Sequence, residues 1–452
     1  MGGLIRQRLA SPPDLLLLSQ NFPGDFPFLL ESSASSRLGR CSMLLLASDE
    51  VLLSDPEHLE PAEFITALKS DYSKSRTDYF PGDSDIPFRG GWFVYMGYEM
   101  ASAAEPALEL PKNSTGVPDA LAVRCRAAIV VFNDQSDQRA EVVAESVSDA
   151  ARILSILDES SFAAETTGSV SESFAMSKID ESDPEDFLSG VCRIHEYLLS
   201  GDVFQVNLSR AWNVGLNDPT SAIDLYRSLR VANPAPFSGV MQWKNRAVLS
   251  SSPERLIEIR QGKVQTRPIA GTRPRDPDPQ RDRELSTELL ENVKERAEHI
   301  MLIDLERNDL GKVCQPGSIE VDELMVIESY AHVHHIVSNV TGRLSADSDP
   351  IDALTAVFPG GTITGCPKIR CMEIIAELEK EGRGFYTGSM GYLCLDGDLD
   401  MNILIRTMLF DESKVSFRTG AGIVADSIPA NELEETRDKA RGLLLALKAN
   451  KP

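Results

Sequence analysis

The chain has 452 residues, a formal net charge of −24, and 42% hydrophobic and 25% charged residues. This length is enough for roughly two or three domains or for one large composite core, and the composition is ordinary for a soluble globular protein. Because contacts with phosphate groups require a basic face, so acidic a chain argues against nucleic acid as a partner. A small anionic substrate is not excluded, since a local basic pocket can lie inside an acidic protein.

The cysteines and the apolar runs indicate the compartment. Seven cysteines are present, and no CxxC pair occurs among them. An odd number without this spacing argues against a disulfide framework or a zinc site and fits a reducing cytosol. The apolar run at residues 15–18 is too short to span a membrane and follows no basic region of the kind found in signal peptides. We therefore expect a cytoplasmic protein with no membrane contact.

Residues 1–155 are predicted to form one α/β domain. Strands are expected at residues 41–47, 90–97 and 127–133, and helices at residues 61–69 and 146–157. The aromatic-rich alternation at residues 90–97 is typical of a strand. Residues 156–183 are dominated by Ser, Glu, Ala and Thr without a hydrophobic period, which predicts a linker.

Residues 184–448 are predicted to form the second, catalytic domain. Asp183 and Pro184 supply an N-cap and a first-turn proline, so a helix should run to about Leu199 and stop at Gly201. Strands are expected at residues 203–212, 239–243, 247–250, 256–259, 318–329, 332–341, 385–395, 402–410 and 415–419, and helices at 283–299, 351–357 and 429–449. Strands outnumber the helices that could cross between them, which favours an α+β fold with large antiparallel sheets.

The segment FPGGTITGCPK at residues 358–368 contains much unusual backbone. Glycines let a ligand approach backbone N–H groups closely, and a helix predicted to begin at Lys368 would offer its unpaired N–H groups to an anion. The segment lacks the GK[ST] ending of a phosphate-binding P-loop, so a nucleotide is not the expected ligand. The pattern indicates an anion-binding loop, and an ordinary connection is the alternative.

Two predicted helices each carry a pair of glutamates. Glu295 and Glu298 lie on one helix, and Glu432 and Glu435 lie on the last. Residues three apart share one face of a helix, so the two pairs together could hold a hard cation such as Mg²⁺. A solvated helix surface is the alternative explanation of each pair alone.

Three of the six histidines fall in AHVHHI at residues 331–336. On a strand, His332 and His334 share one face, as two metal ligands would, and His335 points to the other face. His335 precedes apolar residues, which makes it a candidate for a buried acid or base. Structural packing is the alternative for all three.

Several ordered segments resemble the chorismate-utilising enzymes. They are PIAGTRPR (268–275), RAEHIMLIDLERNDLG (296–311), HVHHIVS (332–338), FPGGTITGCPK (358–368), GSMGYL (388–393) and GAGIVADS (420–427). The resemblance is strong over residues 184–448 and looser over residues 1–155, where LLES and GGWFVYMGYE take part. It implies an α+β fold of two large antiparallel sheets packed with helices around a Mg²⁺-dependent chorismate site.

The resemblance also implies roles for single residues. Glu298 and Glu435 would bind Mg²⁺, with support from Glu295 and Glu432. His335, Glu298 and Thr362 would take part in catalysis. The residues expected to hold the substrate are Gly271, Thr272, Tyr386, Arg406, Gly420, Ala421, Gly422 and Lys439. Arginine and backbone N–H groups suit bidentate recognition of carboxylates, of which chorismate has two.

Leu30, Glu31 and Ser32 lie in the LLES segment, which resembles the tryptophan-binding segment of anthranilate synthases. The partner segment at residues 233–239, NPAPFSG, departs from the usual NPSPYM form. A regulatory tryptophan site, a permanently bound tryptophan and an empty pocket therefore all stay open.

The residue at position 205 indicates whether water or ammonia is the nucleophile. Family members that use water resemble one another in a lysine where this chain has Gln205. Glutamine cannot act as a general base near neutral pH, so ammonia is the expected nucleophile. The chain contains no amidotransferase motif, so a separate glutamine amidotransferase subunit is expected to supply the ammonia.

Two aminated products remain. Ala270 in PIAGT resembles the members that form anthranilate and pyruvate, because members that form 4-amino-4-deoxychorismate often resemble PIKGT, whose lysine attacks the ring. VHH, GGTITG, GSMGYL, NPAPFSG and GGWFVYMGYE instead favour 4-amino-4-deoxychorismate, a precursor of 4-aminobenzoate and folate. The expected reaction is therefore chorismate plus ammonia to 4-amino-4-deoxychorismate, without a lysyl adduct, and anthranilate synthesis is the alternative.

Overall fold

The computed structural model describes residues 4–33, 41–77, 83, 85–133, 139–163, 174, 176–217, 220–329 and 333–448. Its helices are α1 (Leu15–Asn21), α2 (Pro61–Ser75), α3 (Ala101–Ala104), α4 (Val147–Ala163), α5 (Pro184–Ser200), α6 (Ala222–Ala232), α7 (Pro279–Glu291), α8 (Val293–Gly311), α9 (Pro350–Val357), α10 (Lys368–Glu379) and α11 (Pro429–Lys448), with short 3₁₀ turns that include η2 (Tyr98–Met100) and η4 (Gly361–Ile363).

The strands in the first part of the chain are β1 (Ile5–Arg8), β2 (Phe28–Glu31), β3 (Cys41–Ser54), β4 (Gly91–Met96), β5 (Ala120–Phe132), β6 (Ala140–Ala144) and β7 (Met176–Glu181). The later strands are β8 (Gln205–Leu216), β9 (Phe237–Trp243), β10 (Arg246–Ser252), β11 (Arg255–Arg260), β12 (Lys263–Thr266), β13 (Ile269–Pro274), β14 (Glu320–Ser329), β15 (Val333–Arg343), β16 (Gly365–Cys366), β17 (Ser389–Cys394), β18 (Leu399–Asn402), β19 (Thr407–Asp411) and β20 (Lys414–Ile423).

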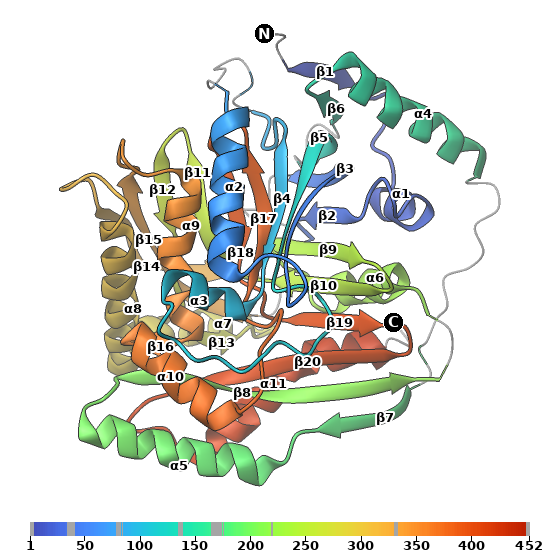
Figure 1. The fold of residues 1–452 in the computed structure, drawn as a ribbon. Helices are drawn as coiled ribbons and strands as arrows, with labels where there is room; N and C mark the ends of the chain where they lie inside the picture. Colours follow the sequence, from blue (N-terminus) through green and yellow to red (C-terminus); the bar gives the residue numbers. More distant parts are fainter. Residues whose placement is uncertain are drawn as a thin grey trace.

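The described strands form one continuous sheet of antiparallel pairs. The long strands β3 and β5 pair with each other and join its two halves. From β3 the pairing continues through β2, β9, β10, β19 and β20 to β8. From β5 it continues through β4, β17, β18, β11 and β12 to β15. Figure 1 shows the first half running across the view and the second half at a steep angle to it.

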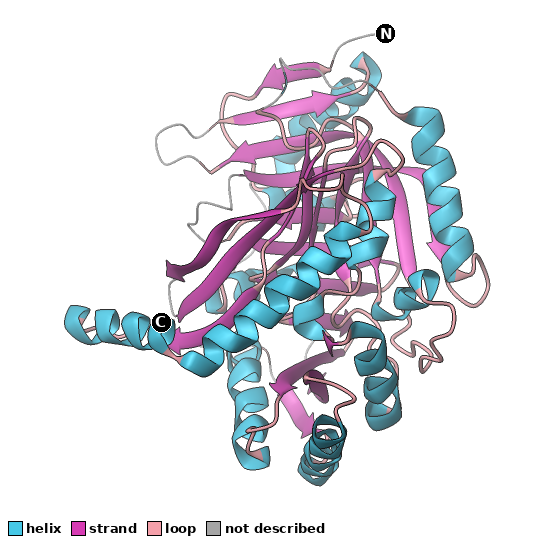
Figure 2. Cartoon of the chain, turned by 90° about the vertical axis from the view of Figure 1, so that its left-hand side faces the viewer, coloured by secondary structure: helices cyan, strands magenta, loops and turns pink. Residues whose placement is uncertain are grey.

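The α+β class is therefore confirmed, and the two expected sheets are halves of one sheet. Side chains from both halves meet in an apolar cluster in which Phe28 of β2 stacks on Phe93 of β4 at 4.0 Å. Helices α1, α4, α6 and α11 cover the first half, and α2, α8 and α9 pack on the second. Figure 2 shows helices lying against many of the strands, while strands at the upper left of the view are uncovered. None of the described helices is long and apolar enough to cross a membrane.

The boundary expected between two domains is crossed by the sheet. Strand β2 pairs with β9, and β4 pairs with β17. The segment at residues 156–183 contains the end of α4 and the strand β7, which pairs with β8. Strands of the first expected domain thus lie between two groups of strands from the second in one sheet, and the division of the chain into two domains stays a prediction.

The N-cap, the first-turn proline and the glycine stop predicted for helix α5 are confirmed. The Asp183 side chain accepts a hydrogen bond from the backbone N–H of Glu185 at 3.0 Å, and Pro184 occupies the first turn. Gly201 ends the helix in the left-handed region at φ +80°. The helix packs against the cluster formed with β8 and α10 through Phe187, Val191, Ile194 and Tyr197.

The prediction of one helix over residues 283–299 is wrong in one respect, because the structure has two helices there. Asn292 leaves the helical region at φ −65° and ψ 112° and so separates α7 from α8. Its side chain then caps α8 by accepting a hydrogen bond from the N–H of Glu295 at 3.1 Å. This break puts Glu295 in the first turn of α8 and Glu298 one turn further along the same face.

The strand expected at residues 402–410 is also interrupted. Strand β18 ends at Asn402 and β19 begins at Thr407, and Arg406 between them has φ +52°. A non-glycine residue in this region is uncommon and stays there only when its surroundings hold it. Arg406 therefore lies outside the strands, so its side chain does not follow their alternation between the two faces of the sheet. It is one of the residues expected to bind substrate.

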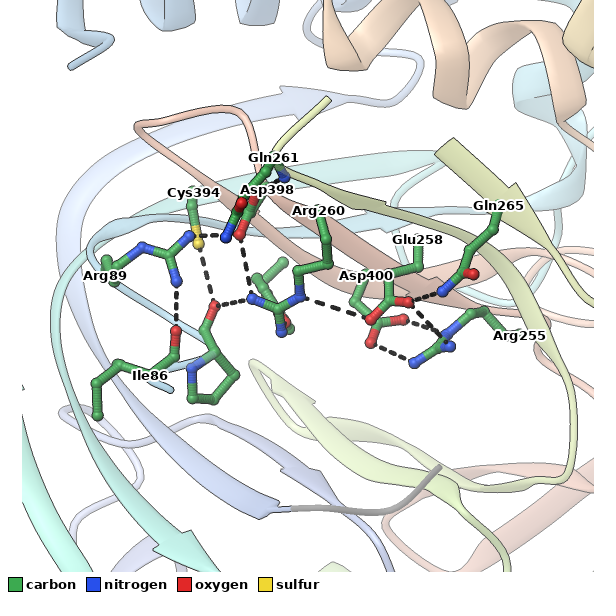
Figure 3. Close-up of polar contacts among 12 residues, drawn as sticks. Ile86, Arg89, Arg255, Glu258, Arg260, Gln261, Gln265, Cys394, Asp398 and Asp400 are labelled. Atoms are coloured by element: carbon green, nitrogen blue, oxygen red, sulfur yellow. Dashed lines mark hydrogen bonds and ion pairs between the residues drawn. The ribbon is translucent and has the colours of Figure 1, made fainter. Parts of the chain in front are cut away.

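A buried polar network joins β11, β18 and the segment before β4 (Figure 3). Arg89 donates to Asp398 at 2.5 Å, and Arg260 donates to the same carboxylate at 3.2 Å. Arg255 holds Asp400 with two hydrogen bonds of 2.9 Å. The planar fork of arginine suits such a bidentate pair. The pair with Asp400 fixes Arg255, which is the neighbour of the buried residue Glu254.

Candidate functional site

The carboxylates expected to bind metal come from α8 and α11, and each of them has a polar partner. Glu298 accepts a hydrogen bond of 2.7 Å from the Gln205 amide, and Glu295 accepts one of 3.2 Å from Arg273. Glu435 forms an ion pair of 2.7 Å with Lys439. Glu432 is half-buried on the same helix as Glu435.

The carboxylates of α8 and α11 interact electrostatically. Burial raises the pKa of Glu298, the Gln205 hydrogen bond lowers it, and the negative charges of Glu295 and Glu435 raise it. Burial likewise raises the pKa of Glu432, and repulsion from Glu435 adds to this effect. Carboxylates that disfavour each other's ionisation are stabilised by a cation between them.

Mg²⁺ fits this donor set. Within the described ranges, no three carboxylate, imidazole or thiolate groups converge into a preformed metal cage. Mg²⁺ does not require such a cage, because it is usually held by one or two carboxylates and completes its shell with waters and substrate oxygens. Glu298 and Glu435, which come from two helices and interact electrostatically, have the chemistry for that role.

His335 lies on β15 beside two other expected site residues. Its Nδ1 is 2.9 Å from the Thr272 hydroxyl, and the backbone of β13 next to it includes Gly271 at φ +64°. Burial lowers the pKa of His335 to about 4, and the positive charge of nearby Arg406 lowers it further. His335 is therefore a neutral imidazole at pH 7. A Cβ on Gly271 would lie 2.7 Å from the Glu295 carboxylate, so this glycine lets β13 approach α8.

His334 has a different role from the metal ligand suggested by its strand position. Its Nε2 is 2.9 Å from Asp282, and its Nδ1 is 2.7 Å from the Ser329 hydroxyl. Both ring nitrogens are thus engaged, which fits packing of α7 against the β14–β15 hairpin. His332, the other histidine of that hypothesis, lies outside the described residues.

Arg406 and Tyr386 lie in the neighbourhood of His335. Within the part of the chain that the structure describes, no hydrogen-bond or ion-pair partner holds the Arg406 guanidinium. Tyr386 is buried, with 3% of its surface exposed, and its hydroxyl lies 2.8 Å from the position of a Cβ on Gly420. The electrostatic influence of Arg406 on both His335 and Tyr386 puts the three residues in one neighbourhood.

Strand β20 forms the opposite wall of the site. Lys439 donates to the Gly420 carbonyl at 3.0 Å. A Cβ on Gly422 would lie 2.3 Å from the Gln205 amide nitrogen, so this glycine makes room for the Gln205–Glu298 contact. Ala421 is fully buried in the apolar cluster on the other face of the strand, so only its backbone can serve the site.

Thr362 in the glycine-rich loop donates a hydrogen bond of 2.8 Å to Glu254. Glu254 is 5% exposed, and burial raises its pKa to about 7. The second threonine of the loop, Thr364, donates to the Gly360 carbonyl at 2.9 Å and so stabilises the loop itself. The loop therefore pairs its Thr362 hydroxyl with the Glu254 carboxyl, which lies between β10 and β11, and leads into the N-terminus of α10.

Two residues of this site do not stand out in the sequence. Glu254 lies in the short connection between β10 and β11, and its only signal in the sequence is a carboxylate between two apolar strands. Asn207 alternates with Gln205 on β8, and its Oδ1 is buried without a hydrogen-bond partner among the described residues. That oxygen is 2.7 Å from the position of a Cβ on Gly420.

The expected effector segment is separate from these residues. Glu31 accepts hydrogen bonds of 2.9 Å from both the Tyr226 hydroxyl and Arg230 of α6. Leu30 pairs with Gly239 across β2 and β9, so the LLES segment adjoins residues 233–239 as expected. Ser32 directly follows β2. Whether Leu30, Glu31 and Ser32 bind tryptophan stays a prediction.

Comparison with known proteins shows the family of the chain. The family model described as chorismate binding enzyme matches residues 27–445. A Synechocystis protein named anthranilate synthase component I-like protein is 42% identical over 365 residues, which cover 80% of this chain and 73% of that protein. Aminodeoxychorismate synthase component 1 of Bacillus subtilis is 47% identical over 263 residues, which cover 58% of this chain and 56% of that protein.

Among solved structures, anthranilate synthase component I of Streptococcus pneumoniae TIGR4 superposes with a TM-score of 0.76 at 31% identity, covering 90% of this chain and 93% of that chain. The family match over most of the chain and this shared fold lead to the same conclusion. The chain belongs to the family of chorismate binding enzymes.

Proposed function

We propose that the protein is a chorismate-aminating enzyme that converts chorismate and ammonia to 4-amino-4-deoxychorismate. The observation that supports amination is the hydrogen bond between Gln205 and Glu298. A water-using enzyme needs a base to remove a proton from its nucleophile. A glutamine whose amide is held by a carboxylate cannot do this, whereas ammonia needs no base to attack.

The charged residues suit the two carboxylates of chorismate. Arg406, which has no protein partner among the described residues, and the Tyr386 hydroxyl would hold one carboxylate. Lys439 and the backbone of Gly420 and Gly422 would hold the other. Glu298 and Glu435 would hold Mg²⁺, which when bound offsets negative charge and draws electron density toward the ring carboxylate.

Loss of the 4-hydroxyl needs a proton donor that is still protonated at neutral pH. Glu254, with a pKa of about 7, meets this condition, while His335, with a pKa of about 4, does not. We therefore assign proton donation to the Glu254 carboxyl, oriented by Thr362. His335 orients a ring substituent through a neutral hydrogen bond.

The proposal includes a partner and a compartment. Relatives named component 1 imply a separate subunit, and we propose a glutamine amidotransferase that supplies ammonia in the cytosol. Glutamine should support turnover only when that subunit is added, whereas ammonium salts at high pH should support it with this chain alone. Glutamine-dependent turnover by the isolated chain would contradict the proposal.

Anthranilate synthesis is the second candidate. Position 270 on β13 holds a buried alanine with 6% exposure, so no nucleophilic side chain is available there for a covalent adduct with the ring. Anthranilate synthase is also the name of relatives that match most of this chain. The contrary sequence features are the GGTITG, GSMGYL and NPAPFSG forms.

One incubation distinguishes the two products. The chain is mixed with chorismate, Mg²⁺ and an ammonium salt at alkaline pH, and the products are separated by chromatography. We expect a 4-amino product that a separate lyase converts to 4-aminobenzoate, with no lysyl adduct in the intact mass of the enzyme. Anthranilate with an equal amount of pyruvate would establish the second candidate instead.

A further inference from the structure

Arg383 lies between α10 and β17, next to the candidate site. It is a buried cation that donates several hydrogen bonds. Its side chain and that of Glu379 are each only 1% exposed. Arg383 holds Glu379 in a bidentate pair, with Nε at 3.0 Å and Nη2 at 2.7 Å. The same guanidinium donates to two carbonyls, that of Ile363 at 3.1 Å and that of Asn207 at 2.8 Å.

Those two carbonyls belong to different walls of the candidate site. Ile363 directly follows Thr362 in the glycine-rich loop. Asn207 is on β8, two residues after Gln205, and its side chain abuts Gly420. A single planar group therefore ties the loop that carries Thr362 to the strand that carries Gln205.

Arg383 also contacts a third wall of the candidate site, the turn that carries Tyr386. The Arg383 guanidinium is 5.5 Å from the ring centre of Tyr386 and 4.9 Å from that of Tyr98. The Tyr386 backbone N–H donates to the Arg383 carbonyl at 3.1 Å, which closes the turn between them. Tyr98 belongs to η2, and its N–H donates to the Gly384 carbonyl at 2.8 Å, so the early part of the chain clamps this turn.

Stability alone is a poor explanation for this cation. Taking an ion pair out of water costs several kcal/mol per ion, and apolar residues of similar size are often as stabilising. What an apolar side chain cannot supply is a rigid set of donors aimed at three segments at once. The loop and the turn carry Thr362 and Tyr386, which are expected to contact chorismate, and β8 carries Gln205, which holds the expected Mg²⁺ ligand Glu298.

We propose that Arg383 is a positioning residue for chorismate, which holds the Thr362 loop, strand β8 and the Tyr386 turn in one fixed arrangement. It touches no substrate itself. Its loss lets the three walls move relative to one another, and small displacements of binding groups weaken ground-state and transition-state contacts. This inference rests on the proposed chorismate site and is independent of which aminated product is formed.

The test compares Arg383→Gln with Arg89→Gln. Arg89 is a matched control, because it is also a buried arginine, 8% exposed, that pairs with two carboxylates. These are Asp398 (Figure 3) and Asp396, and neither is a candidate site residue. Calorimetry measures the Kd of chorismate with Mg²⁺ and without ammonium. Kinetics with ammonium give KM and kcat, and thermal unfolding gives Tm.

We expect Arg383→Gln to raise Kd and KM for chorismate about tenfold or more, since displacement of positioning groups by about 1 Å can cost a hundredfold. Arg89→Gln should lower Tm about as much as Arg383→Gln does. It should leave the Kd and KM of chorismate unchanged. Arg383→Lys should be intermediate, because an ammonium group can reach Glu379 but cannot hold both carbonyls. An unchanged Kd in Arg383→Gln, or an equal rise in both glutamine variants, would overturn the proposal.

If Arg383→Gln does not fold, Glu379→Gln replaces it. This variant keeps the size of the side chain and weakens the pair that orients the guanidinium, so Kd should still rise. An unchanged Kd in folded Glu379→Gln would also overturn the proposal. Failure of the unmodified protein to bind chorismate would instead contradict the proposed function.

Discussion

Gln205 donates a hydrogen bond of 2.7 Å to Glu298, and only the absence of a side chain at Gly422 leaves room for the donating amide. The contact joins β8, α8 and β20 at the carboxylates expected to bind Mg²⁺. It also excludes a base from the position where a water-using enzyme would need one. In the proposed function, one amide therefore links metal binding and the choice of nucleophile.

Gln205→Leu should weaken Mg²⁺ binding. The variant removes the hydrogen bond that lowers the pKa of Glu298 and orients its carboxylate. Loss of such an orienting partner typically costs about 10- to 100-fold in metal affinity or activity. A Mg²⁺ titration of activity at saturating chorismate measures the change. Gln242→Leu is the control, because Gln242 makes comparable hydrogen bonds to Ser19, which is not a site residue. Equal Mg²⁺ dependence in both variants would contradict the assignment.

Gly422→Ala should cause the same defect by a steric route. Its Cβ would come within 2.3 Å of the Gln205 amide nitrogen, a distance that forces Gln205 away from Glu298. We expect a loss of activity similar to that of Gln205→Leu, and little further loss when the two changes are combined. Gly24→Ala is the control, since no atom lies within 4 Å of a Cβ at that position. Fully additive losses in the double variant would show that the two residues act separately.

Glu254→Gln should remove the proton donor. A positioned acid contributes about 10²- to 10⁴-fold to the rate, so kcat should fall by that order while the Kd of chorismate changes little. With rates corrected for the fraction of free ammonia, the unmodified enzyme should lose activity as pH rises through about 7, the pKa of the Glu254 carboxyl. Glu254→Gln should lack this dependence.

Thr362→Val provides a graded version of that experiment. The Thr362 hydrogen bond lowers the pKa of Glu254 against the larger effect of burial. Without the hydroxyl, the Glu254 carboxyl should stay protonated to higher pH, so the fall in rate should move upward in pH. A pH profile of kcat measures the shift, and a downward shift would be inconsistent with Glu254 as the acid.

Glu306→Gln should stabilise the protein above neutral pH. Burial raises the pKa of Glu306 from its usual value near 4.5 to about 7, and the Asp309 charge adds to this effect. Because the folded state favours the protonated carboxyl, the resulting stability is complete below about pH 4.5 and is lost as pH rises through 7. The shift corresponds to a difference on the order of 3 kcal/mol.

The glutamine resembles the protonated acid at every pH. Tm of Glu306→Gln should therefore exceed that of the unmodified protein at pH 8 and approach it at pH 5. Thermal unfolding at the two pH values, with Mg²⁺ absent, measures this difference. A Tm lowered equally at both pH values would show that Glu306 is needed as a carboxylate.

Local patterns in the sequence determined many of the elements. The cap and the glycine stop of α5 depend on neighbours within a few residues, and so did the helical spacing that put Glu298 one turn after Glu295. The ordered motifs identified the family, because spacing along the chain is preserved by descent even where the contacts are unknown. The break at Asn292 was missed, since one residue can cap a helix or continue it with little difference in local preference.

Only the tertiary structure decided which distant residues meet. Residues 205, 298 and 422 are adjacent because three elements pack together, and no local rule measures that distance. The role of Glu254 depends on burial, which alone raises its pKa far enough to keep a proton near neutrality. Arg383 is unremarkable in the sequence, yet it contacts three walls of the site. Long-range packing sets solvation and distance, and those two quantities decide what a carboxylate or a guanidinium can do.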